Sequence, residues 1–101
     1  MIRREKHMQF MVMSRRRTEQ FGDADFERVI PDETDRIRQL YADGVVRQIW
    51  LRDDLLGACF VIEASTVEDA RSIVDALPMA RLGLSEFTVL PLRPYRGFGP
   101  R

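Results

Sequence analysis

The stretch GVVRQIWLRDDLLGACFVIE, residues 44–63, decides the fold because it carries the one clear hairpin signal in the chain. Residues 45–51 and 55–62 are two runs rich in β-branched, aromatic and aliphatic side chains, as is typical of strands. Arg52, Asp53 and Asp54 separate the two runs, and aspartate favours turns. We therefore predict two adjacent antiparallel strands. Their side chains alternate between two largely apolar faces, so we expect each face to be packed against another layer of protein.

Two further strands are predicted at residues 8–14 and 85–92, one near each end of the chain. Alternation divides their side chains into two sets. One set is Phe10, Val12, Phe87 and Val89; the other is Gln9, Met11, Met13, Glu86, Thr88 and Leu90. Pro91 and Pro94 predict an edge strand or an early exit from the sheet, because proline cannot donate a ladder hydrogen bond.

Helical spacing of apolar residues predicts two helices between these strands. The first stripe consists of Phe26, Val29, Ile30, Ile37, Leu40 and Tyr41. Pro31 interrupts it, which predicts either a kink or two pieces, and Gly44 is expected to cap its C-terminal end. Thr66 is expected to cap the second helix, which should end near Pro78. We expect residues 79–84 to be a connection without helix.

The predicted order is strand, helix, strand, strand, helix, strand. This order describes a ferredoxin-like α+β sandwich with both helices on one face of a four-stranded antiparallel sheet. The second face would carry Met11, Met13, Cys59, Val61 and Leu90, which are too apolar for bulk water. We therefore expect a homodimer in which two sheets pack face to face as a dimeric α+β barrel, with room for a small organic molecule between them. Higher homo-oligomers are also compatible with this pattern.

Length and composition indicate one folded domain. The chain has 101 residues, of which 45% are hydrophobic and 32% charged. We expect residues 8–95 to form the domain, residues 1–7 to be a disordered leader and residues 96–101 to be a flexible tail. No apolar run approaches the roughly 20 residues needed to cross a bilayer.

Charge and cysteine content narrow the function classes. Sixteen basic and sixteen acidic side chains give no net charge, which argues against a dedicated nucleic-acid binder. One cysteine excludes an internal disulfide framework and fits a reducing cytoplasm. We find no glycine-rich phosphate loop, no spacing typical of a metal site and no Ser/His/Asp set, so no cofactor and no metal are predicted.

Three stretches, GVVRQIWL, CFVIEASTVEDA and ALPMARLGLSEFTVLPL, resemble the muconolactone isomerase-like and YCII-like branches of the dimeric α+β barrel superfamily. Arg47 and Trp50 match the arginine and tryptophan of the isomerase-like second strand, and Glu63 matches an acidic residue that closes the third. In the YCII-like pattern a histidine follows a proline by two positions; here Glu33 follows Pro31. The resemblance implies a cofactor-free isomerase that moves a proton on a small carboxylated or lactone substrate.

Such an enzyme needs a base next to a carbonyl and a donor for the enolate. Glu63, Glu33 and Glu86 are candidate bases, and Arg47 is a candidate carboxylate ligand. Candidate pocket residues are Met11, Met13, Trp50, Cys59 and Thr88. Arg47 and Trp50 differ by three positions, so a regular strand would place them on opposite faces and only a bulge could unite them.

A second hypothesis assigns the protein no catalytic activity. In it the chain is a non-catalytic barrel that binds an apolar small molecule, or an accessory domain that serves assembly. The methionine-rich face favours this reading, whereas Arg47 and the acidic residues favour the enzyme.

Overall fold

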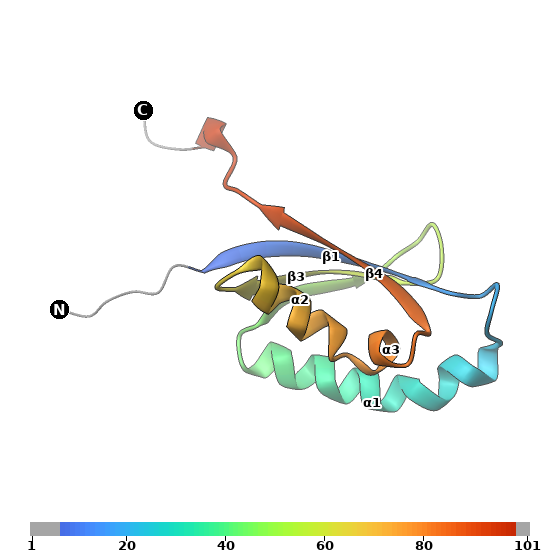
Figure 1. Cartoon of the computed structure of the whole chain (residues 1–101). Coiled ribbons are helices and arrows are strands. Elements are labelled where there is room, and N and C mark those ends of the chain that lie inside the picture. Colours follow the sequence, from blue (N-terminus) through green and yellow to red (C-terminus); the bar gives the residue numbers. More distant parts are fainter. Residues whose placement is uncertain (1–6, 99–101) are drawn as a thin grey trace.

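The computed structural model describes residues 7–98, and in this range four strands form one antiparallel sheet. They are β1 (Met8–Arg16), β2 (Val46–Leu51), β3 (Ala58–Ala64) and β4 (Ser85–Leu92), in the spatial order β2-β3-β1-β4. The helices are α1 (Asp23–Ala42), α2 (Val67–Asp75) and the short α3 (Pro78–Arg81), followed by a 3-10 turn, η1 (Arg96–Phe98). All three α-helices cover the same face of the sheet (Figure 1). The predicted ferredoxin-like βαββαβ fold is confirmed.

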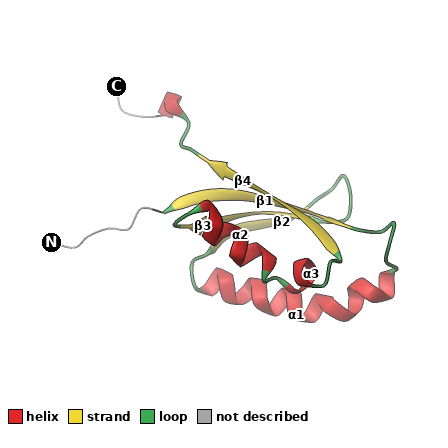
Figure 2. Ribbon diagram, in the orientation of Figure 1, coloured by secondary structure: helices red, strands yellow, loops and turns green. Residues whose placement is uncertain are grey.

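The predicted hairpin is confirmed, but its second strand begins later than expected. Leu55 and Leu56 belong to the connecting loop rather than to β3, and both are exposed. The backbone N–H of Arg52 donates to the carbonyl of Gly57 at 2.9 Å, which closes the hairpin around a loop instead of a tight turn. The loop projects past the end of the sheet in Figure 2.

Helix α1 is one helix of 20 residues with Pro31 inside it. Of the two alternatives predicted for this proline, a kink or two separate pieces, the second is therefore excluded. Proline lacks only one helical donor, and the packing along a long amphipathic face offsets that loss. The predicted glycine cap is confirmed: Gly44 has φ +79°, and the N–H of Val45 donates to the carbonyl of Leu40 at 2.8 Å. Only glycine adopts this left-handed conformation at low cost.

Helix α2 begins as expected, because the side chain of Thr66 accepts the N–H of Asp69 at 3.0 Å. It ends at Asp75, and Pro78 then starts a second short helix where we expected only a connection. Proline is favoured in the first turn of a helix because its missing N–H would have no partner there. Residues 78–81 thereby lie under the start of β4.

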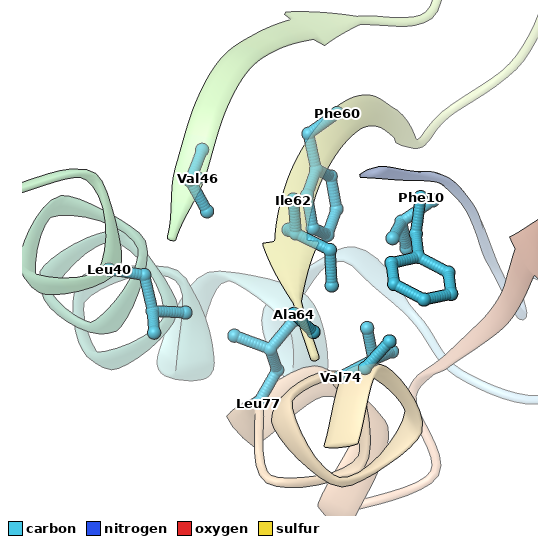
Figure 3. Close-up of a cluster of buried hydrophobic side chains, with 10 residues drawn as sticks. Phe10, Leu40, Val46, Phe60, Ile62, Ala64, Val74 and Leu77 are labelled. Atoms are coloured by element: carbon cyan, nitrogen blue, oxygen red, sulfur yellow. The ribbon is translucent and has the colours of Figure 1, made fainter. Parts of the chain in front are cut away.

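The main core lies between the sheet and the helices (Figure 3). The predicted inward residues Phe10 and Val12 are fully buried, as are Ile62 from β3 and Val74 and Leu77 from the α2 region. A second cluster of Phe26, Met79 and Leu84 fills the space between α1 and α3. These clusters fix α1 and the α2–α3 pair against one side of the sheet only.

The opposite side of the sheet, which we call the open face, is covered by none of the α-helices of residues 7–98 (Figures 1 and 2). Met11, Met13, Cys59 and Val61 are partly buried there, and Leu90 keeps 43% of its surface exposed. The alternation of side chains in β1 and β3 was therefore predicted correctly.

Candidate functional site

A cleft of about 370 Å³ lies on the helix side, between α1 and one end of the sheet. Its walls are mainly apolar and include Ile37 from α1, Phe60 from β3 and Phe87 from β4. Ile49 and Leu51 of the edge strand β2 also line it and remain 43% and 85% exposed. Concave, largely apolar sites with a few polar groups are the usual form of small-molecule sites.

Glu33 places a carboxylate in this cleft. One carboxylate oxygen accepts the backbone N–H of Met79, the second residue of α3, at 2.9 Å. Burial raises the pKa of Glu33 above its ordinary value, and the hydrogen bond from Met79 opposes that shift without cancelling it. A carboxyl group with a raised pKa is a better proton acceptor than an ordinary surface glutamate.

Two arginines also line the cleft, and neither forms an ion pair with Glu33 within the described residues 7–98. The guanidinium of Arg16 lies over the ring of Phe26, 5.3 Å from its centroid. Arg38 is exposed on α1. The cleft therefore combines a carboxyl group and two separate cations with apolar walls.

The wall of the cleft beside β1 is closely packed. Ser14 is buried, and its Oγ accepts the N–H of Ala58 at 2.9 Å. At Gly57 a Cβ atom would come within 2.0 Å of the carbonyl oxygen of Ser14, so only glycine fits. Ser14 thus serves to join β1 to β3, and Ser85 supplies a second buried hydroxyl at the cleft.

The other candidate residues from the sequence lie on the open face, so the structure separates them from Glu33. Cys59 and Glu63 occupy β3 positions on this face, and Thr88 pairs with Met13 across β4 and β1. Glu86 is bound to Arg15, with 3.4 Å between Oε1 and Nε. Glu33 and Glu63 therefore cannot act on one small substrate.

A β-bulge between Val46 and Gln48 brings Arg47 and Trp50 to the same side of the sheet. Trp50 pairs with Cys59 on the open face, and Arg47 reaches Glu63 there, with 3.6 Å between Nε and Oε2. Nδ1 of His7 lies 3.8 Å from the other oxygen of Glu63. Arg47, Glu63 and His7 thus form a polar cluster at one end of the open face.

Sequence reasoning missed the cleft itself, and with it Arg16, Arg38 and Ser85. A signal was present: Glu33 falls on the same helical stripe as Ile30 and Ile37, so α1 carries an acid toward the sheet. Arg16 gave no such signal within α1, because it lies in β1 and only the fold brings it to the helix.

No family model matches the chain. No curated protein matches it either. In the part of the chain that the structure describes, no helix is both long and apolar enough to span a membrane. The same residues contain no group of three or more His, Cys, Asp or Glu side chains that could hold a metal ion.

Proposed function

We propose that the chain binds a small, largely apolar organic molecule in the cleft between α1 and the sheet and moves a proton on it, with Glu33 as the acid/base group. The observation that carries this proposal is the carboxylate of Glu33, which lies among apolar walls with its pKa raised by burial. Burial of a carboxylate is costly, and a carboxyl group in a cleft with a pKa shifted by burial is a candidate acid/base group.

The chemistry requires no cofactor. Glu33 takes a proton from a carbon next to a carbonyl and returns it to another carbon of the same molecule, so no net proton or electron is exchanged. Arg16 or Arg38 holds a carboxylate of the substrate by charge-assisted hydrogen bonds. The backbone N–H of Met79 fixes the orientation of Glu33. This reaction class is the one implied by the resemblance to the muconolactone isomerase-like group.

Glu33→Gln tests the proposal, with Glu63→Gln as the matched control on the open face. The substrates are a panel of small unsaturated lactones and enol acids that carry a carboxylate. Proton–deuterium exchange and isomerisation are followed by NMR in deuterated water. We expect turnover of at least one compound by the unchanged protein and by the Glu63 variant, and at least a roughly 100-fold loss in the Glu33 variant. Equal turnover by all three proteins contradicts the role of Glu33.

A second proposal concerns assembly: two chains pair through their open faces to form a homodimer. It is supported by the apolar side chains of this face: Trp50 and Leu90, on the two edge strands, are 50% and 43% exposed, and the methionines of β1 between them are partly buried. A patch of this kind on a monomer marks an interaction surface. Face-to-face sheets would leave the helix-side cleft of each chain accessible.

Sedimentation equilibrium tests this assembly. We expect the unchanged protein to be a dimer at micromolar concentration and Val61→Glu to be a monomer. The control Leu82→Glu changes an exposed residue outside the sheet, at the end of α3, and should remain a dimer. A monomeric unchanged protein contradicts the proposal.

A further inference from the structure

The middle of the open face holds a cluster of sulfur atoms from two strands that are distant in sequence. The Sγ atom of Cys59 in β3 lies 3.2 Å from the Sδ atom of Met11 in β1. Met13, two residues further along β1, is the direct register partner of Cys59. One thiol and two thioethers thus lie on the same side of two neighbouring strands, and all three residues are partly buried.

We propose that Cys59, Met11 and Met13 bind one Cu(I) ion, with the thiolate and both thioethers as its ligands. Thiolate and thioether sulfur are soft ligands that select Cu(I) over harder divalent ions. Nitrogen and oxygen ligands in the numbers that such ions prefer are missing here, because residues 7–98 contain no cluster of three His, Cys, Asp or Glu side chains.

The distance between the sulfur atoms of Cys59 and Met11 fits such a site after a small movement. At a metal–sulfur distance of about 2.3 Å, the ligands of a trigonal site are about 4 Å apart. Cys59 and Met11 would therefore separate by under roughly 1 Å, which methionine permits because it has three rotatable bonds. Binding releases the thiol proton to solvent as the Cu–S bond forms, and no electron is transferred.

A neighbouring aromatic side chain provides a signal for metal binding. Trp50 in β2, the strand that flanks β3 on the side away from β1, is the register partner of Cys59. It is the only tryptophan in the chain. Its indole fluorescence should therefore report a metal at Cys59. All three ligands come from one chain, and in the proposed homodimer each set would lie in the interface between the two sheets.

The experiment titrates the full chain anaerobically with Cu(I) supplied as its bicinchoninate complex, and separately with Ag(I), a soft ion without redox chemistry under these conditions. Competition with the chelator gives the affinity, and Trp50 fluorescence gives an independent reading. We expect one ion per chain and quenching of Trp50. Cys59→Ser should lower the affinity at least about 100-fold, and the double variant Met11→Leu/Met13→Leu by about 10–100-fold.

Two controls make the result specific. Met8→Leu changes a methionine of the same strand that packs on the helix side, and His7→Gln removes the imidazole at the end of the open face. Both should bind like the unchanged protein. Leucine is close to methionine in size, so the double variant is expected to fold. If Cys59→Ser does not fold, Cys59→Ala takes its place. Unchanged affinity in the double methionine variant, or no quenching of Trp50 in the unchanged protein, overturns the proposal.

Discussion

The carboxylate of Glu33 in the middle of α1 accepts the backbone N–H of Met79 in α3 at 2.9 Å. This bond joins α1 to α3 through two residues that are 46 positions apart in the sequence, next to the cluster of Phe26, Met79 and Leu84. A single polar contact thus contributes both to the packing of the helical layer and to the geometry of the cleft.

The raised pKa of Glu33 predicts a pH dependence of stability. The folded protein binds the Glu33 proton more tightly than the unfolded chain does, so this stabilisation is complete below the ordinary pKa of 4.5 and is lost as pH rises through the folded pKa. Glu33→Gln cannot ionise and keeps an acceptor for Met79. The free energy of unfolding of the variant, relative to the unchanged protein, should therefore increase with pH across this interval and then become constant. Urea unfolding at several pH values measures it; a difference independent of pH contradicts the prediction.

Gly57→Ala should destabilise the protein by about 1–3 kcal/mol or more, because the added Cβ would collide with a backbone carbonyl at Ser14 that the sheet holds in place. Gly22→Ala is the control, since the nearest atom to its Cβ is Oδ2 of Asp25 at 3.9 Å, an ordinary van der Waals distance. Urea unfolding of both variants makes the comparison. An equal loss of stability in both variants would show that the close contact at Gly57 does not contribute to the destabilisation.

Thr66→Ala should cost about 1 kcal/mol, because the N–H of Asp69 loses the hydroxyl that accepts its hydrogen bond at the start of α2. Thr66→Ser retains the hydroxyl and should lose much less. Thermal unfolding followed by circular dichroism compares the two variants. If serine and alanine destabilise equally, the cap is not the cause.

Leu77→Ala should cost about 2–5 kcal/mol, since the side chain is fully buried between the α2 region and the sheet. Leu82→Ala provides a matched control with 55% exposure and should change stability by less than about 0.5 kcal/mol. Chemical unfolding measures both. Similar values for the two leucines would contradict the assignment of the core.

The element order followed from sequence because each element carries local physical signals. Alternation placed Phe10 and Val12 on the covered face, glycine at position 44 ended α1, and Thr66 started α2. The errors fell where tertiary contacts override local preference. Packing of a long apolar face keeps α1 continuous through Pro31, and a hydrogen bond from Arg52 to Gly57 closes a loop that includes Leu55 and Leu56.

The sequence by itself determined the ferredoxin-like fold and the apolar character of both sheet faces, because the periodicity of apolar residues is a local property of the chain. Only the tertiary structure decided which polar and sulfur-containing groups meet. It placed Glu33 in a cleft away from Glu63, used a bulge to bring Arg47 and Trp50 to one side, and set the thiol of Cys59 beside Met11. These relationships depend on strand register and on contacts between residues about 40 to 50 positions apart in some cases, which spacing along one segment does not encode.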